Sequence, residues 1–208
     1  MIYIAGIGPG NAMLLTAEVM CILESCTCII GTTRQLETVS KACVLDQNTE
    51  IITYQGKLET LFDKLQYALK RHTNICVLAS GDPVFYGIGE WVKRTFSRQS
   101  IRYLSGISSA QTMFQRIDKP MHDVYMTSVH GRKPDWALWL SLKRLCILTD
   151  SVWTPNAIAR GFLERGIDPM IIVGERLSYG DECITQAIAS NLEERDYDMC
   201  VVVIEIEG

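Results

Sequence analysis

ICVLASGDPVFYG, residues 75–87, is a short apolar run followed by an abrupt break. The run Ile75–Ala79 has β-branched residues and no charge, which indicates a buried parallel strand or a piece of buried helix. Gly81 and Pro83 end the run, because glycine and proline interrupt regular structure and the residue before proline avoids helical backbone. Apolar residues at helical spacing then predict a helix over residues 86–96. Open α/β sheets bind ligands at such strand-turn-helix junctions.

Asp82 is a lone acidic side chain in this turn. Its carboxylate is well placed to accept hydrogen bonds from backbone amides, or from a hydroxyl or ammonium group of a ligand. The alternative is that Asp82 only caps the helix that follows. The residues alone leave both interpretations open.

Composition restricts the class of protein. The 208 residues carry a net charge of −4 and are 48% hydrophobic, which is typical of one large domain or two small ones with a substantial core. The acidic balance argues against a nucleic-acid-binding protein. No apolar run approaches the roughly 18 residues of a membrane helix, and the chain opens directly on a strand without signal-peptide features. We therefore predict a cytoplasmic protein without nucleic-acid or membrane partners.

Eight cysteines are many for a cytoplasmic chain, but they are scattered. They form no CxxC pair, and no histidine lies at zinc-ligand spacing from them. Five lie in or beside apolar runs, where a free thiol behaves as a small hydrophobic group: Cys21, Cys28, Cys76, Cys146 and Cys200. The sequence therefore predicts reduced core thiols and no bound metal.

The first predicted strand, residues 1–5, leads into Gly6-Ile7-Gly8-Pro9-Gly10. This loop does not match the dinucleotide-binding fingerprint, because Pro9 lacks an amide proton and the third glycine comes too early. The next helix, capped by Thr16, also begins several residues later. The spacing therefore contradicts a nicotinamide-dependent oxidoreductase. It suits close approach of backbone to a flat or bulky ligand.

Strands and helices alternate five times in the first half of the chain, which predicts a mostly parallel sheet covered on both faces. The predicted strands are residues 1–5, 28–31, 50–53, 75–79 and 101–104. Asp118-Lys119-Pro120 is the best candidate linker. The later predicted strands are separated by few connections, which favours antiparallel pairing: 124–129, 145–149, 170–173, 182–189 and 199–206. We therefore expect an α/β protein with domains at residues 1–117 and 118–208, the second with a mixed sheet.

Three motifs in order resemble the tetrapyrrole methyltransferases, the class III S-adenosylmethionine enzymes, over the whole chain. They are GIGPG at residues 6–10, SGDPVFYG at 80–87 and GISS at 106–109. The resemblance implies two α/β/α domains with the cofactor bent in a cleft between them. The cofactor contacts that it implies are Pro9, Gly81, Asp82, Phe85, Ser108, Ser109, Asp150 and Leu177. For the two serines, capping of the helix after the fifth strand is the alternative.

SVHGR at residues 128–132, LTD at 148–150 and VGERLS at 173–178 resemble the branch of this family that methylates carbon 5 of (cobalt-)precorrin-7 in cobalamin biosynthesis. The resemblance implies a homodimer, for which the apolar helix at residues 136–142 offers either an interface or a core face. Because the chain ends after its last strand, we expect the C15-methyltransferase/decarboxylase to be a separate subunit. Two alternatives stay open: methylation of another ring position, and a diphthamide-type protein methyltransferase. A non-enzymatic tetrapyrrole-binding protein is a third, which the intact Gly81-Asp82-Pro83 disfavours.

Methyl transfer to a ring carbon needs a sulfonium held in line about 3 Å away, and a base can assist the loss of a proton. His130 is the candidate base, because it lies beside a glycine at a strand end. A hydrogen-bonded structural histidine is the alternative. Guanidinium groups after strand ends are candidates for the carboxylates of the substrate: Arg34, Arg132 and Arg176. The resemblance implies that Gly8, Gly10 and Tyr86 face the tetrapyrrole.

Overall fold

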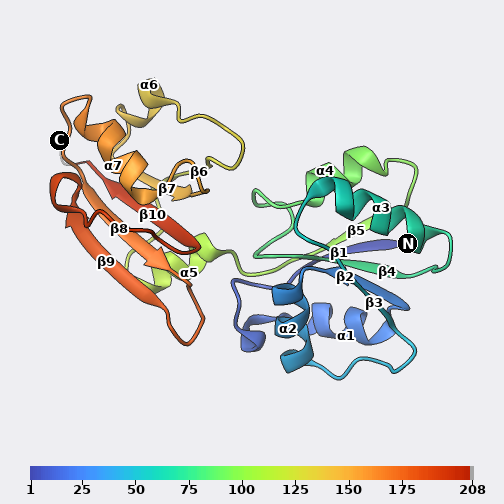
Figure 1. The fold of residues 1–208 in the computed structure, drawn as a ribbon. Coiled ribbons are helices and arrows are strands. Elements are labelled where there is room, and N and C mark those ends of the chain that lie inside the picture. Colours follow the sequence, from blue (N-terminus) through green and yellow to red (C-terminus); the bar gives the residue numbers. More distant parts are fainter. Residues whose placement is uncertain (207–208) are drawn as a thin grey trace. The chain divides into compact units, whose positions relative to one another are not determined.

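The computed structural model describes residues 1–206 and divides the chain into two compact units, Met1–Ser108 and Ser109–Gly208 (Figure 1). Each unit is built on one five-stranded sheet. The second unit begins with helix α5 (Ser109–Arg116), which packs on strand β10 (Cys200–Glu205). The sequence-based division after residue 117 instead assigns α5 to the first domain.

The first unit contains a parallel sheet with strand order β3-β2-β4-β1-β5. Its strands are β1 (Ile2–Gly6), β2 (Cys28–Gly31), β3 (Glu50–Thr53), β4 (Ile75–Ala79) and β5 (Ile101–Leu104). All five residues of β4 are buried, as its uncharged sequence predicts. The predicted parallel sheet is therefore confirmed, with β4 at its centre.

Four helices cover this sheet, with α1 and α2 on one face and α3 and α4 on the other (Figure 1). They are α1 (Ala17–Ser25), α2 (Thr33–Ala42), α3 (Leu58–Leu69) and α4 (Gly89–Thr95). Alternate residues of β4 point to opposite faces: Val77 belongs to the core under α3, and Leu78 to the core under α1. The predicted helix over residues 86–96 is too long, because Tyr86 has a φ of 53° and cannot continue a helix.

The second unit contains a mixed sheet with strand order β6-β7-β10-β8-β9. Its other strands are β6 (Tyr125–Ser128), β7 (Arg144–Leu148), β8 (Met170–Glu175) and β9 (Cys183–Ile188). β6 and β7 are parallel, and the remaining pairs are antiparallel. β6, β7 and β8 therefore all run in one direction, so their carboxyl ends lie at the same edge of the sheet.

Helices α6 (Trp136–Trp139) and α7 (Pro155–Leu163) cover one face of the second sheet, and α5 covers the other (Figure 1). Trp136 packs edge-on against Trp139 and against Phe162 of α7. A side chain at Gly161 would come within 2.1 Å of the Trp136 ring, so glycine makes room for this packing. The apolar side of the helix predicted over residues 136–142 therefore packs in the core of the second unit. The helix itself, α6, is shorter than predicted.

The eight cysteines are all free thiols. Burial raises the pKa of Cys28 and of Cys146 to about 12 each, which keeps both in the unreactive thiol form at neutral pH. Among residues 1–206, no group of three histidine, cysteine or acidic side chains is arranged to hold a metal ion. The prediction that no metal is bound remains a prediction. Within the same residues, no helix has the length and apolar character needed to cross a membrane.

Candidate functional site

The loops after β1 and β4 are joined by a two-residue bridge at the carboxyl edge of the first sheet. Gly81 donates its backbone N–H to the carbonyl of Gly8 at 2.8 Å, and Gly8 donates to the carbonyl of Gly81 at 3.2 Å. Gly8 has a φ of 76°, a conformation that side chains disfavour. The GIGPG and SGDP motifs are therefore parts of one local structure, although Gly8 and Gly81 are 73 positions apart in the chain.

A third glycine brings the loop after β5 into the same structure. A Cβ atom at Gly106 would lie 2.2 Å from the carbonyl oxygen of Gly81 and 2.6 Å from the carbonyl carbon of Gly6. Three chain segments thus meet through bare backbone, at distances that no side chain permits. We call Gly6, Gly81 and Gly106 the glycine contact. It holds the loops after β1, β4 and β5 tightly together at the carboxyl edge of the sheet.

The carboxylate of Asp82 ties two of these loops together. Its Oδ2 accepts the N–H of Gly106 at 3.1 Å, and its Oδ1 accepts the N–H of Val84 at 2.9 Å. Helix α4 is preceded by Ile88, which makes no side-chain cap. Of the two interpretations of Asp82, capping of α4 is therefore wrong, and the acceptance of hydrogen bonds from backbone amides is confirmed.

Arg34 also lies at this edge, beside the residue that follows β4. Its guanidinium Nη2 donates to Ser80 Oγ at 3.0 Å, and the side chain of Gln35 donates to the same oxygen at 3.1 Å. The sequence analysis does not identify Ser80 or Gln35 as site residues. One sequence signal could have pointed to Gln35, namely its capping-box spacing from Thr32. The side chains of these two residues bond each other's backbone at the start of α2.

The other predicted residues of the first unit have different environments. Pro9 and Ser108 are buried, and Gly10 accepts a hydrogen bond from Thr38 of α2 at its carbonyl, at 3.4 Å. Phe85 and Tyr86 form an edge-to-face ring pair with centroids 5.1 Å apart. Tyr86 is 42% exposed. Tyr86 is thus partly accessible to solvent, and its backbone is in the left-handed region with a φ of 53°.

In the second unit, His130 lies after β6 and is held by a buried serine. Ser128 Oγ lies 3.1 Å from His130 Nδ1 and accepts the backbone N–H of His130 at 3.3 Å. Asp150, after the neighbouring strand β7, accepts the N–H of Val152 at 2.9 Å and of Trp153 at 2.7 Å. The structure therefore places the two predicted residues on adjacent loops at one edge of the sheet.

The Asp150 carboxylate also bonds the backbone N–H of Gly131, next to His130. Partial burial acts to raise its pKa, but the three backbone N–H groups and the nearby His130 outweigh burial and hold the pKa below its usual value. The carboxylate is thus ionised at neutral pH. Asp150 is first of all an anchor for the loop that carries His130.

The three predicted substrate arginines differ in their surroundings. Arg34 lies in the first unit, and Arg132 is exposed on the loop after His130. Arg176, after β8, contacts Asp181 at 2.6 Å and Asp198 at 3.2 Å. Two carboxylates already compensate its charge, so Arg176 is better explained as an ion-paired loop residue than as a contact to a substrate carboxylate.

Leu177 is buried, and it lies between two non-glycine residues with positive φ, 46° at Arg176 and 70° at Ser178. Backbone in this region costs roughly 1–3 kcal/mol per residue and is retained where the surroundings enforce it. Here Ser178 donates its N–H to the Glu182 carboxylate at 2.5 Å, and Arg176 donates to the carbonyl of Met199 at 2.9 Å. The conformation at Leu177 is therefore firmly held.

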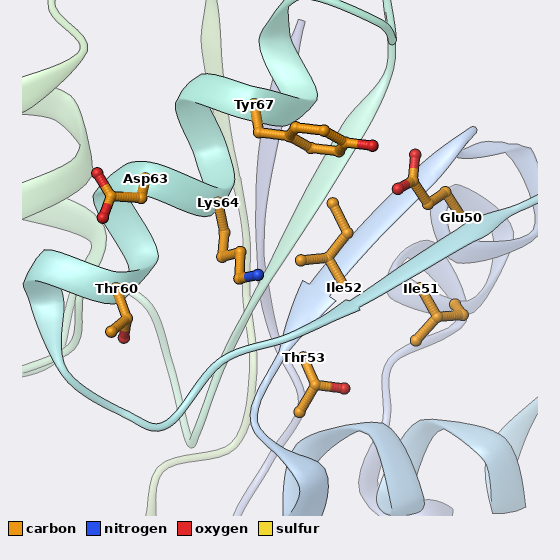
Figure 2. A pocket seen from close by; sticks show the side chains of 8 residues that line it. All are labelled: Glu50, Ile51, Ile52, Thr53, Thr60, Asp63, Lys64 and Tyr67. Carbon is orange, nitrogen blue, oxygen red and sulfur yellow. The ribbon is translucent and has the colours of Figure 1, made fainter.

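An open groove of about 520 Å³ lies elsewhere in the first unit, between edge strand β3 and helix α3 (Figure 2). Figure 2 shows its lining, which is Glu50, Ile51, Ile52, Thr53, Thr60, Asp63, Lys64 and Tyr67. The lining mixes both signs of charge, and the groove follows a strand edge rather than the loops at the carboxyl ends. The predicted site residues lie outside it, so the loops remain the candidate site.

The structure thus has two α/β units, and glycine-rich loops follow strands of the first one. Comparison with known proteins identifies the family that has this architecture. The chain belongs to the family of tetrapyrrole (corrin/porphyrin) methylases, whose model matches residues 1–193.

Individual relatives agree with this family. A cobalt-precorrin-7 C(5)-methyltransferase of Salmonella typhimurium is 29% identical over 205 residues, 98% of each chain. The solved precorrin-6Y methylase of Archaeoglobus fulgidus is 23% identical, with a TM-score of 0.74 and coverage of 100% of this chain and 99% of that one. The uroporphyrin-III C-methyl transferase of Thermus thermophilus, solved with S-adenyl homocysteine, has a TM-score of 0.79 at 20% identity, with coverage of 98% and 96%. These two structural likenesses support the predicted fold.

Proposed function

We propose that this chain transfers the methyl group of S-adenosylmethionine to carbon 5 of cobalt-precorrin-7 in cobalamin biosynthesis. The observation that carries the proposal is the match, over 98% of both chains, to a Salmonella protein of that activity. The SVHGR, LTD and VGERLS segments in the second unit agree with it. The form of the substrate without cobalt, precorrin-7, is the closest alternative.

In this proposal the loops described above bind the methyl donor. The residues that would hold S-adenosylmethionine are Pro9, Gly81, Asp82, Phe85 and Ser108 in the first unit, and Ser109, Asp150 and Leu177 in the second. When bound, the cofactor supplies an electrophilic methyl group. The glycine contact would hold the loops after β1, β4 and β5 together, and Asp82 would keep the loops after β4 and β5 in one arrangement. A solved relative of the same fold carries S-adenyl homocysteine, which supports this choice of cofactor.

The remaining predicted residues would act on the tetrapyrrole. Gly8, Gly10 and Tyr86 would lie against the macrocycle, and Arg34 and Arg132 would bind side-chain carboxylates. His130 would take up the proton that the ring loses, with Ser128 holding Nδ1 so that Nε2 is available to the substrate. Each of these residues orients the ring or moves a proton, because the methyl donor is already reactive.

The test of this function is incubation of the purified protein with cobalt-precorrin-7 and a methyl-labelled donor, followed by NMR. Label at carbon 5 is the expected result. Label at another ring position would agree with a tetrapyrrole methyltransferase activity but reject methylation at carbon 5. Transfer to a protein acceptor instead would favour a diphthamide-type activity and reject the proposal.

Asp82→Ala is expected to weaken binding of S-adenosylhomocysteine by about 1–3 kcal/mol, roughly 5- to 150-fold. The physical reason is that the Gly106 and Val84 amides lose their common acceptor, so that the loops after β4 and β5 are no longer held together. Titration calorimetry measures the affinity. Asp63→Ala, which removes an exposed carboxylate from α3, is the matched control. Wild-type affinity in folded Asp82→Ala would show that Asp82 does not support the cofactor site.

The proposal also includes a cytoplasmic homodimer and, as a partner, a separate C15-methyltransferase/decarboxylase subunit. Because the α6 face is part of a core, the dimer would use another surface. Light scattering of the purified protein measures its mass in solution. The mass of two chains is the expected result, and the mass of one chain would contradict the homodimer.

A further inference from the structure

Ser80 follows the last residue of β4, at the edge of the sheet where the candidate site lies. Its hydroxyl oxygen is contacted by two side chains of α2, Arg34 Nη2 at 3.0 Å and Gln35 Nε2 at 3.1 Å. A guanidinium group is always a donor. The orientation of the Gln35 amide is also determined, because its Oε1 accepts the backbone N–H of Thr32 at 2.8 Å. Its nitrogen must therefore face Ser80.

A serine hydroxyl has two acceptor positions and one proton to donate. Arg34 and Gln35 fill both acceptor positions of Ser80 Oγ, so a ligand at this hydroxyl can interact with it only as an acceptor. Ser80 is exposed and Gln35 is 6% exposed. The buried amide thus fixes the direction of a surface hydroxyl, and the adjacent guanidinium adds positive charge.

The geometry points to Ser80 and Arg34 as a binding site for one carboxylate of a ligand, with Gln35 as the residue that positions Ser80. An oriented O–H and a guanidinium N–H side by side match the two oxygens of a carboxylate. An ammonium group is disfavoured, because it would meet the O–H of Ser80 and the positive charge of Arg34. The inference rests on the proposed function and deepens it, since both proposed ligands carry carboxylates.

The carboxylate has two possible sources, a side chain of the tetrapyrrole or the amino-acid end of the cofactor. Two titrations separate them without turnover. The first measures S-adenosylhomocysteine binding by calorimetry. The second measures cobalt-precorrin-7 binding by absorbance in the presence of S-adenosylhomocysteine, which has no methyl group to donate. Both are made on wild type, Ser80→Ala, Ser80→Thr and Arg34→Gln. The controls are Ser40→Ala on α2 and Arg102→Gln on β5, both at exposed residues away from these loops.

We expect Ser80→Ala to raise one of the two Kd values about tenfold, the loss typical of a hydrogen bond to a charged group. Arg34→Gln should raise the same Kd by at least as much, and Ser80→Thr, which keeps the hydroxyl, should stay near wild type. A rise confined to cobalt-precorrin-7 assigns the substrate carboxylate, and a rise for S-adenosylhomocysteine assigns the cofactor.

Unchanged values for both ligands in folded Ser80→Ala and Arg34→Gln would overturn the inference. Equal losses in Ser80→Ala and Ser80→Thr would also overturn it, because the hydroxyl would then not be the determinant. These outcomes are distinct from failure of the proposed function, which is read from the position of the methyl label in the wild-type product.

Discussion

Gly106→Ala is expected to destabilise the first unit and to abolish measurable S-adenosylhomocysteine binding. The added Cβ would lie 2.2 Å from the Gly81 carbonyl oxygen and 2.6 Å from the Gly6 backbone. Both neighbours are backbone atoms at the ends of paired strands, so the loops must move apart. Overpacking of this kind costs typically about 1–3 kcal/mol, and the absence of any flexible side chain among the contacts favours the upper end.

Urea denaturation measures the loss of stability, and calorimetry measures the loss of binding. Gly180→Ala is the matched control, because it makes the same change where no atom lies within 4 Å of the added Cβ. It should change the free energy of unfolding by no more than about 0.5 kcal/mol. A Gly106→Ala protein with wild-type stability and affinity would mean that the glycine contact is not required for the site.

His130→Ala is expected to lower kcat by roughly 100-fold if its imidazole takes up the substrate proton. The affinity for S-adenosylhomocysteine should stay near wild type, because His130 is not among the residues proposed to hold the cofactor. Ser128→Ala should produce a smaller loss of the same kind, since Ser128 Oγ fixes the ring at Nδ1.

His122→Ala is the control for this experiment. His122 is exposed, and only its backbone carbonyl is used, as an acceptor for Arg144 at 3.1 Å. Its side chain should therefore be removed without loss of activity. If His130→Ala keeps the wild-type kcat, His130 is not the base. The alternative interpretation, a hydrogen-bonded structural histidine, would then hold.

Much of the architecture follows from local patterns. The predicted bounds of β2, β3, β4 and β5 are those that the structure has, although β3 and β5 each contain one charged residue. These elements are set by residues within one turn or one strand of each other. The start of the helix after the SGDP turn is predicted too early. Tyr86 has a left-handed backbone conformation, which cannot be predicted from a tyrosine side chain.

The pairings within the candidate site are less accessible from the sequence. Arg34 and Ser80 are 46 residues apart, and Asp82 and Gly106 are 24 apart, so their hydrogen bonds exist only once the sheet is assembled. Arg176 follows a strand end just as Arg34 does. The fold brings two aspartates to Arg176, and one of them, Asp198, lies in the loop just before β10.

The glycine contact lies wholly within residues 1–108, because β1, β4 and β5 all belong to that unit. Its walls consist of main-chain atoms, whose shape is indifferent to the side chains on neighbouring positions. Surrounding loop residues can therefore diverge while this surface stays the same, provided that the three glycines are kept. A chimera that joins this first unit to the second unit of another family member would inherit the surface intact. Exchange of second units would therefore separate the contribution of the loops that carry His130 and Arg132 to substrate preference from that of the first unit.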